Sequence, residues 1–166
     1  CRTSAANIWP IGDVIGPPMR AHVASAEGVV AAESMCGHEG PAMRYDNVPS
    51  CTYTQPQVAS VGLTEAKAKE RGPIKVGRFP FRALGKALAI NEKEGFVKLV
   101  FDAKHGELLG AHLIGSEATE MIAERGLARA LETTNPELHR TIHAHPTLAE
   151  AVMEAAGEAY GECIHI

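Results

Sequence analysis

Apolar and polar residues alternate along three stretches of the chain, residues 74–81, 95–101 and 108–114. A period of two predicts strands with one buried and one exposed face. Only the short polar segment 102–106 separates the last two stretches. Because so short a loop cannot carry a parallel crossover, these two strands are expected to pair as an antiparallel hairpin. The pattern therefore predicts an antiparallel sheet.

Two shorter strands are predicted ahead of this sheet, over residues 50–54 and 58–62, with Gln55-Pro56 between them. Thr64 follows at a position suited to cap a short helix that ends at Arg71-Gly72. The segment between the first and second alternating stretches, residues 82–94, shows no clear pattern.

The last third of the chain changes to helical spacing. Ser116 is predicted to open one helix, and Asn135-Pro136 is predicted to cap another that runs through Leu138 and Ile142. The predicted apolar face of the first helix consists of Ala118, Met121, Ile122, Ala128 and Leu131. Strands followed by helices predict an α+β fold, an antiparallel sheet with helices packed on one face.

The first part of the chain has a different organisation. Residues 7–11 are mostly apolar and run into Gly12-Asp13, as expected for the end of a buried strand entering a loop. A helix is predicted over residues 19–36, with Gly37 as its stop. The polar segment that follows predicts a domain boundary near Arg44, giving a unit of residues 1–44 and a second unit of residues 45–166.

Composition is that of a globular protein. The 166 residues are 45% hydrophobic and 22% charged, with a formal net charge of −4. The acidic balance offers no basic surface for nucleic acid, and no apolar run reaches the length of a membrane span. Because the chain starts at Cys1-Arg2 and enters an apolar segment almost at once, we expect it to be a fragment of something longer.

The four cysteines, Cys1, Cys36, Cys51 and Cys163, show neither C-x-x-C nor C-x4-C spacing. They are expected to be reduced thiols, and neither a redox dithiol nor a zinc site is predicted from them.

The most informative segment is His143-Ala-His145-Pro146-Thr147-Leu148-Ala149-Glu150. Pro146 is expected at the first helical position, with His145 at the cap and Glu150 about a turn inside the helix. A carboxylate there would accept a hydrogen bond from one ring nitrogen and leave the other nitrogen free to take a proton. This arrangement favours a general base that makes a thiolate or alkoxide.

Other interpretations of these segments remain open. His-Pro before a helix is also common as a structural cap, and His143-x-His145 suggests a metal site, although no third ligand follows at suitable spacing. Gly12-Asp13 after an apolar segment suits a polyol or nucleotide ligand, but an Asx turn at a strand end gives the same pattern. The dinucleotide motif G-x-G-x-x-G is absent from the sequence.

Three motifs together resemble a known family. Residues 7–14 (Asn-Ile-Trp-Pro-Ile-Gly-Asp-Val), residues 16–22 (Gly-Pro-Pro-Met-Arg-Ala-His) and residues 143–150 are similar to segments of the pyridine nucleotide-disulfide oxidoreductases, and most similar to the dihydrolipoamide dehydrogenase branch. Residues 53–62 resemble the start of that family's interface domain. The resemblance covers the whole chain but only the last third of such an enzyme.

The resemblance implies roles for individual residues. Asp13 would contact the ribityl or pyrophosphate part of FAD, and Met19, Arg20, Ala21 and His22 would lie against the flavin, largely through backbone. His145 would be the proton acceptor for a dithiol in the partner subunit's site, with Glu150 as its orienting carboxylate. Arg20 stands where the family usually carries an apolar residue, and Gln57 where it usually has Glu.

The resemblance also implies a function for the intact enzyme: oxidation of dihydrolipoamide by NAD⁺ through FAD and a redox disulfide, with roles in cell redox homeostasis. The expected partners are a second copy in a homodimer and a lipoyl domain of a 2-oxo acid dehydrogenase complex or glycine cleavage system. The expected compartment is the cytoplasm, or the mitochondrial matrix in a eukaryote. Without the redox cysteines and nucleotide motifs, this chain alone is expected to be inactive and to bind neither cofactor tightly.

Two alternatives remain at the level of function. The chain could serve only as a self-association module, or it could be the same region of a glutathione or mercuric reductase. The single Cys163 in the tail, where mercuric reductase carries a neighbouring pair, and the run Leu148-Ala149-Glu150 both favour the lipoamide branch.

Overall fold

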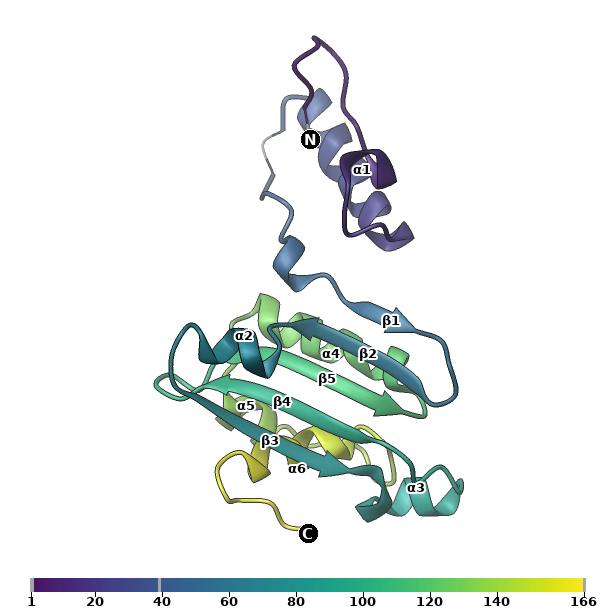
Figure 1. The fold of residues 1–166 in the computed structure, drawn as a ribbon, viewed down its shortest axis with the longest axis vertical. Helices are drawn as coiled ribbons and strands as arrows, with labels where there is room; N and C mark the ends of the chain where they lie inside the picture. Colours follow the sequence, from purple (N-terminus) through teal and green to yellow (C-terminus); the bar gives the residue numbers. More distant parts are fainter. Residues whose placement is uncertain (1, 39, 166) are drawn as a thin grey trace. The chain divides into compact units, whose positions relative to one another are not determined.

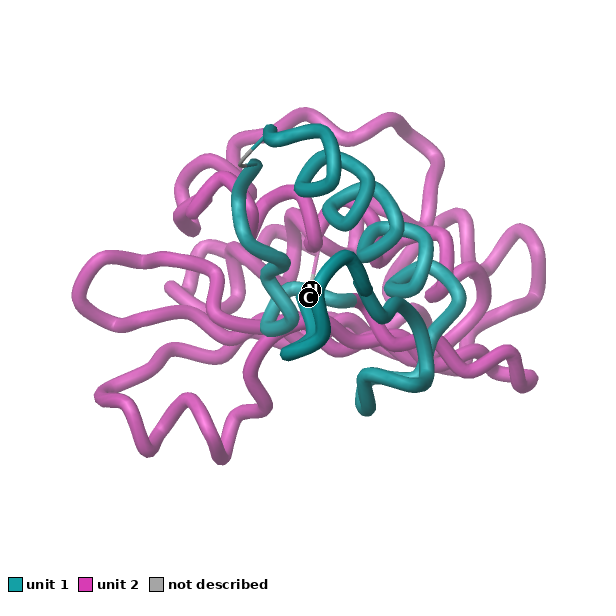
Figure 2. Tube along the Cα trace, turned by 90° about the horizontal axis from the view of Figure 1, so that it is seen from above, with its two compact units in different colours: residues 1–48 teal, residues 49–166 magenta. Residues whose placement is uncertain are grey.

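The computed structural model describes residues 2–38 and 40–165. Contacts along the chain divide it into two compact units, residues 1–48 and residues 49–166 (Figure 2). Cys1, one of the four predicted free thiols, lies outside the described residues. Each unit is described by itself below.

The first unit is built around one helix, α1 (Ala21–Met35). The predicted helix and its stop are confirmed: Gly37 has a φ of 76°, and the His38 amide donates to the Glu33 carbonyl at 2.9 Å across the helix end. The 3-10 turns η1 (Gly12–Ile15) and η2 (Tyr45–Asn47) precede and follow α1.

The strand predicted over residues 7–11 does not form. Ile8 and Ile11 are exposed, and no strand is present among the described residues of this unit. A strand needs a hydrogen-bonded neighbour, and the apolar pattern that suggested one does not supply it.

The second unit contains a five-stranded sheet in the order β1-β2-β5-β4-β3, with every neighbouring pair antiparallel (Figure 1). The α+β fold class, including the antiparallel sheet, is confirmed. The strands are β1 (Ser50–Thr52), β2 (Gln57–Gly62), β3 (Ile74–Pro80), β4 (Phe96–Asp102) and β5 (Leu108–Gly115).

The alternation that predicted the sheet is also what builds its core. On β4, Val97 and Leu99 are fully buried, and they pair in register with Leu113 and Ala111 of β5. Lys98, between them on β4, lies on the opposite face and pairs with His112. Each strand of the hairpin therefore gives one face to the core and one to the open side.

Three helices cover one face of this sheet: α4 (Ala118–Ala130), α5 (Asn135–Arg140) and α6 (Glu150–Glu158) (Figure 1). Helix α4 packs on β2 and β5, α6 packs on β3 and β4, and α5 packs on α6. The short α2 (Glu65–Lys69), capped by Thr64 as predicted, lies on the other face, where Glu65 pairs with Arg78 and Lys98. The turn η3 (Phe81–Ala83) and helix α3 (Gly85–Ala89) were not predicted.

The predicted ends of α4 and α5 need correction. Helix α4 starts at Ala118 rather than Ser116, because Glu117 takes a left-handed conformation with a φ of 58°. Leu131 lies beyond its end and is 69% exposed, whereas the other predicted apolar residues of its face are buried.

Helix α5 is capped by Thr134 rather than Asn135. Thr134 forms a capping box with Glu137, and Asn135 is instead buried, donating from Nδ2 to the Ala156 carbonyl at 2.6 Å. The helix ends at Arg140, so Ile142 is not part of it and is 95% exposed. Within the described residues, no helix is long and apolar enough to cross a membrane.

Helix α6 approaches β3 more closely than side chains would allow. A Cβ added at Gly77 of β3 would lie 1.8 Å from the Ala155 carbonyl oxygen and 2.8 Å from the Ala159 amide nitrogen. The helix presents its small residues Ala151, Ala155 and Ala156 to the sheet, all fully buried. Backbone contact between α6 and β3 therefore depends on glycine at position 77.

We predict that Gly77→Ala destabilises the second unit by about 3 kcal/mol, because backbone atoms of α6 must move to admit the methyl group. The matched control is Gly126→Ala in α4, where nothing lies within 4 Å of the added Cβ. There the same change is expected to stabilise by about 0.5–1 kcal/mol through helix propensity. Urea unfolding followed by circular dichroism measures both, and equal effects at the two positions would contradict the contact.

Candidate active site

The segment with the two histidines forms an ordered loop between α5 and α6. Pro146 was predicted to start the last helix, and this is wrong: α6 begins at Glu150, four positions later. The residues before it are held by side-chain hydrogen bonds instead of helical ones: Thr147 donates its amide to Glu150 Oε2 at 2.8 Å and its hydroxyl to the Ala144 carbonyl at 2.7 Å. The Glu150 carboxylate thus provides an acceptor for the Thr147 amide, which has no helical partner ahead of α6.

The hydrogen bond expected between the ring and the carboxylate is present. His145 Nδ1 lies 2.9 Å from Glu150 Oε1, with the imidazole 76% exposed and the carboxylate side chain only 16% exposed. Among the described residues, none hydrogen-bonds the other ring nitrogen, Nε2. The ring is therefore anchored on one side and open to solvent on the other, as a proton acceptor requires.

Glu150 is held in its ionised form. Burial raises the pKa of this carboxyl group, but the Thr147 amide, the His145 hydrogen bond and the nearby charges of His145 and His165 together bring it below its usual value of 4.5. The carboxylate is thus charged at neutral pH and orients the imidazole through a charge-assisted hydrogen bond.

The other histidine of the motif points into the fold. His143 Nε2 lies 3.1 Å from Glu124 Oε1 on α4, and its Nδ1 lies 2.9 Å from the Thr141 carbonyl. The His143 side chain is only 6% exposed. His143 therefore ties the start of the loop to α4, a positioning contact that the sequence did not predict.

Arg125 lies beside this contact and is fully buried. Its Nη1 donates to Glu124 Oε2 at 2.9 Å, while no hydrogen-bond partner for its Nε and Nη2 is found among the described residues. Burial lowers the pKa of Arg125 to about 10, and the Glu124 charge opposes that shift. The Arg125 guanidinium is therefore a second ionic partner of the Glu124 carboxylate, in addition to His143.

The predicted flavin-facing residues all lie in the first unit. Asp13 is exposed within η1, Met19 is exposed, and Arg20 is the residue before α1, whose first two residues are Ala21 and His22. The loop is held by Glu27, buried on α1, which accepts the Gly12 amide at 2.7 Å and the Tyr45 hydroxyl at 2.8 Å. This role of Glu27 could not be predicted from the sequence, because its partners Gly12 and Tyr45 are distant along the chain.

Among residues 2–38 and 40–165, no disulfide joins Cys36, Cys51 and Cys163, and no group of three His, Cys, Asp or Glu side chains is arranged to hold a metal. Gln57, singled out in the sequence, accepts from the Thr119 amide and hydroxyl at 3.1 and 2.8 Å and so joins β2 to α4.

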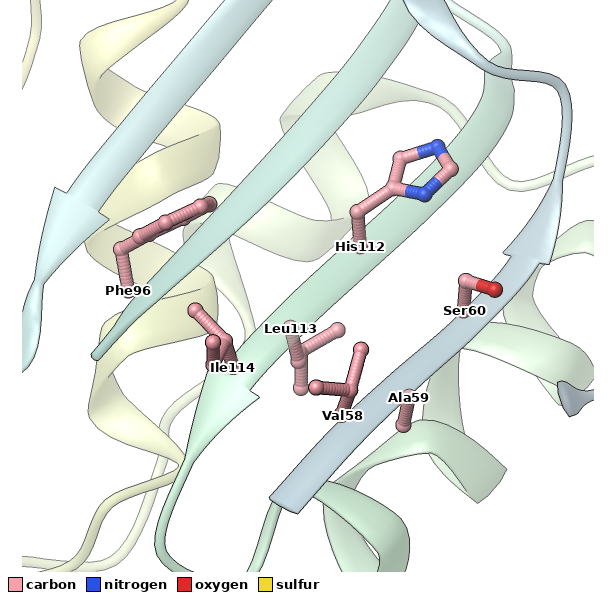
Figure 3. Close-up of a pocket in the computed structure, with 7 residues that line it drawn as sticks. All are labelled: Val58, Ala59, Ser60, Phe96, His112, Leu113 and Ile114. Carbon is pink, nitrogen blue, oxygen red and sulfur yellow. The ribbon is translucent and has the colours of Figure 1, made fainter. Parts of the chain in front are cut away.

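A pocket of about 300 Å³ lies on the face of the sheet opposite α4 and α6 (Figure 3). It is lined by Val58, Ala59, Ser60, Phe96, His112, Leu113 and Ile114. Burial lowers the pKa of His112, and its Nε2 lies 3.0 Å from the Leu63 carbonyl. This pocket shares no lining residue with the His145–Glu150 pair.

The antiparallel sheet with helices on one face is the fold of the interface region of a disulfide oxidoreductase. Residues 48–156 match the family described as pyridine nucleotide-disulphide oxidoreductase, dimerisation domain, and the chain belongs to this family.

Two curated relatives with about 50% identity to this chain are both named dihydrolipoyl dehydrogenase. The chain is 53% identical over 167 aligned residues to the dihydrolipoyl dehydrogenase of Zymomonas mobilis, covering 99% of this chain and 36% of the relative. It is 49% identical to that of Bacillus subtilis, covering 99% of this chain and 35% of the relative. The chain thus spans about a third of the length of the relatives it matches.

Solved structures have the same fold. LpdA from Mycobacterium tuberculosis superposes with a TM-score of 0.88 at 27% identity, covering 93% of this chain and 34% of that one. The Cu(II) complex of the HOCl-induced flavoprotein disulfide reductase RclA from Escherichia coli gives 0.86 at 28% identity, covering 94% and 36%.

We predict that the His143–Glu124 contact stabilises the fold most at mildly acidic pH. The Glu124 hydrogen bond raises the pKa of His143 above 6.5, against the effect of burial, so this stabilisation is complete below 6.5 and is lost as the pH rises through the folded value. Burial raises the pKa of Glu124, but the His143 hydrogen bond brings it below 4.5, so its contribution is lost as the pH falls through the folded value.

The measurement is urea unfolding of wild type and His143→Gln at about pH 5.5 and about pH 8.5. The difference between them should be about 1 kcal/mol larger at the lower pH, a modest figure because the Glu124 side chain is 38% exposed. His105→Gln, an exposed histidine in the β4–β5 turn, serves as the control. A difference that does not change with pH would contradict the predicted charged contact.

Proposed function

We propose that this chain is the C-terminal part of a flavoprotein disulfide oxidoreductase that oxidises dihydrolipoamide with NAD⁺. The observation that carries the proposal is the His145–Glu150 hydrogen bond at 2.9 Å, with the second ring nitrogen open to solvent. Relatives named dihydrolipoyl dehydrogenase, at about half identity over the whole chain, support the choice of substrate.

In this proposal His145 Nε2 takes the proton of a dihydrolipoamide thiol. The thiolate attacks one sulfur of a redox disulfide, forming a mixed disulfide while the second sulfur leaves as a thiolate. The other substrate thiol then attacks the substrate sulfur of the mixed disulfide, which closes the lipoamide disulfide and releases the first enzyme sulfur, and that sulfur leaves with the thiol's proton. Glu150 stabilises the imidazolium that forms and keeps the ring aimed. The redox disulfide belongs to the part of the enzyme that this chain does not include.

We propose that residues 1–44 are the end of an FAD-binding domain and that the dimerisation domain follows from residue 45. Asp13 and the segment Met19, Arg20, Ala21 and His22 would contact the flavin, and FAD would carry the electron pair from the dithiol to NAD⁺. Their surroundings suit a large bound group: Ile11, Val14 and Met19 are exposed around the Asp13 loop. Gly12 has a φ of 72°, and a Cβ added there would lie 3.4 Å from the Ala24 Cβ.

The lipoamide branch is favoured over glutathione and mercuric reductases. The relatives at about 50% identity are named dihydrolipoyl dehydrogenases, whereas the disulfide reductase RclA is similar at 26–28%. The natural substrate in this proposal is dihydrolipoamide on a lipoyl domain of a 2-oxo acid dehydrogenase complex or a glycine cleavage system, in the cytoplasm or the mitochondrial matrix.

We also propose that the second unit forms a homodimer. Leu127 in α4 and Leu131, the residue that follows its end, lie one turn apart and are exposed. The exposed Ile142 is held near the same helix by the neighbouring His143–Glu124 contact. An exposed apolar row of this kind suits an isologous contact with a second copy. Self-association would then bring His145 of one subunit to the thiols of the other.

We predict that His145 is required for dithiol oxidation. A full-length enzyme is assembled from the first two thirds of the Zymomonas mobilis relative and this chain, and lipoamide-dependent NADH turnover is measured. His145→Gln should lower the rate about 10²–10⁴-fold, since that is the usual contribution of a general base, and Glu150→Gln should lower it less.

The control is His105→Gln, which should leave the rate unchanged. Flavin content and oligomeric state are measured for each variant, so that a loss of rate is interpreted only where both are retained. If His145→Gln keeps full activity across the pH range, the pair is a structural cap. If the unsubstituted chimera reduces glutathione disulfide but not lipoamide, the substrate assignment is wrong.

We predict that charge on the exposed row of α4 prevents dimerisation of this chain. Leu127→Glu and Leu131→Glu should shift the sedimentation coefficient from dimer to monomer, because a carboxylate cannot be buried there without a partner. Leu88→Glu on α3, also an exposed leucine, is the matched control and should leave the dimer intact. A monomeric wild-type chain, or a dimer that tolerates both α4 substitutions, would contradict this surface.

A further inference from the structure

A second histidine-carboxylate pair lies beside the first. Glu150 and Glu154 are one turn apart on α6, and His165 Nδ1 hydrogen-bonds Glu154 Oε1. A small crevice of about 50 Å³ is lined by His145, Glu150, Glu154 and His165, together with the segment Ala83, Leu84 and Gly85. Both pairs therefore open onto one place in the fold.

Glu154 fixes the chain after α6. It is only 2% exposed and accepts the Ile164 amide and the Cys163 thiol, each at 3.0 Å, in addition to the His165 ring. Burial raises the pKa of Glu154, but these hydrogen bonds bring it below 4.5, so the carboxylate is charged. A buried carboxylate with three donors from one turn determines where that turn lies.

The His165 ring is held at the mouth of the crevice, with its side chain 62% exposed. The ionisable groups that face it are Glu154 and Glu150 from α6, Cys163 from its own turn and His145 from the loop; Ala83, Leu84 and Gly85 contribute none. The hydrogen bond and charge of Glu154, with the charge of Glu150, raise the pKa of His165 above 6.5, and the His165 charge in turn favours ionised Glu150.

We propose that Glu154 and His165 form a positioning pair for the acid-base site. Glu154 holds the C-terminal turn by hydrogen bonds, so that the His165 cation lies beside the Glu150 carboxylate. The pair does not touch substrate in this scheme. Its effect is to keep Glu150 ionised at lower pH than the His145–Glu150 pair would reach alone. The role in catalysis rests on the proposed function, whereas the electrostatic coupling does not.

The coupling is tested on this chain by NMR titration of the Glu150 carboxyl carbon. His165→Gln should raise the pKa of Glu150 by about half a pH unit, as expected for loss of one partly screened neighbouring charge. His165→Lys keeps the positive charge and should leave that pKa nearly unchanged. In a Glu154→Gln background, where the turn is released, the further change His165→Gln should have no effect. An unchanged Glu150 titration in His165→Gln would overturn the proposal.

The catalytic consequence is tested in the chimeric enzyme. The part of the acid limb of the pH profile for lipoamide turnover that reflects protonation of Glu150 should move to higher pH in His165→Gln by a similar amount, and His165→Lys should restore it. His105→Gln is the control for a general change in charge. A uniform loss of rate with an unmoved profile would show a merely structural role and contradict the proposal. Absence of activity in the unsubstituted chimera would instead count against the proposed function and would leave the NMR result standing.

Discussion

The backbone contact between α6 and β3 at Gly77 is the constraint on which the site depends. Because the Ala155 carbonyl lies where a Cβ at position 77 would be, strand and helix cannot slide relative to each other without breaking that fit. A hydrogen bond beside Gly77 also joins the two elements: the Arg78 amide of β3 donates to Glu158 Oε2 of α6 at 2.9 Å. This packing sets the position of Glu150 and Glu154 relative to the sheet. These two carboxylates in turn bond the His145 and His165 rings and the amides of Thr147 and Ile164.

A recurring device places the functional loops: a helical carboxylate accepts a backbone amide from a loop outside its own helix. Glu27 accepts Gly12, Glu150 accepts Thr147, and Glu154 accepts Ile164. Such bonds are charge-assisted, and removing the acceptor leaves a loop amide without its partner. The loops are therefore ordered by a few specific acceptors, and only secondarily by apolar packing.

The sheet could be predicted because its signal is local: Val97, Leu99 and Lys98 report their faces by alternation alone. The strand over residues 7–11 was wrongly predicted, since strand formation depends on a neighbour that no local pattern reveals. The His145–Glu150 bond was predictable from spacing, but the start of α6 at Glu150, four positions after Pro146, was not. His165 and Glu154 were missed because eleven residues and a reversal of the chain separate them.

Glu150 is suited to proton chemistry because its two oxygens have different tasks. Oε2 is held by the Thr147 amide, a donor that does not titrate, so the carboxylate keeps its orientation whichever state the imidazole is in. Oε1 faces only the ring, so the energy of the hydrogen bond from Nδ1 changes when a proton arrives at Nε2. Glu154, one turn away, is arranged in a similar way: its Oε2 accepts the Ile164 amide and the Cys163 thiol, and its Oε1 bonds the His165 ring. The two carboxylates of α6 thus share one design, in which a backbone amide fixes one oxygen and an imidazole bonds the other.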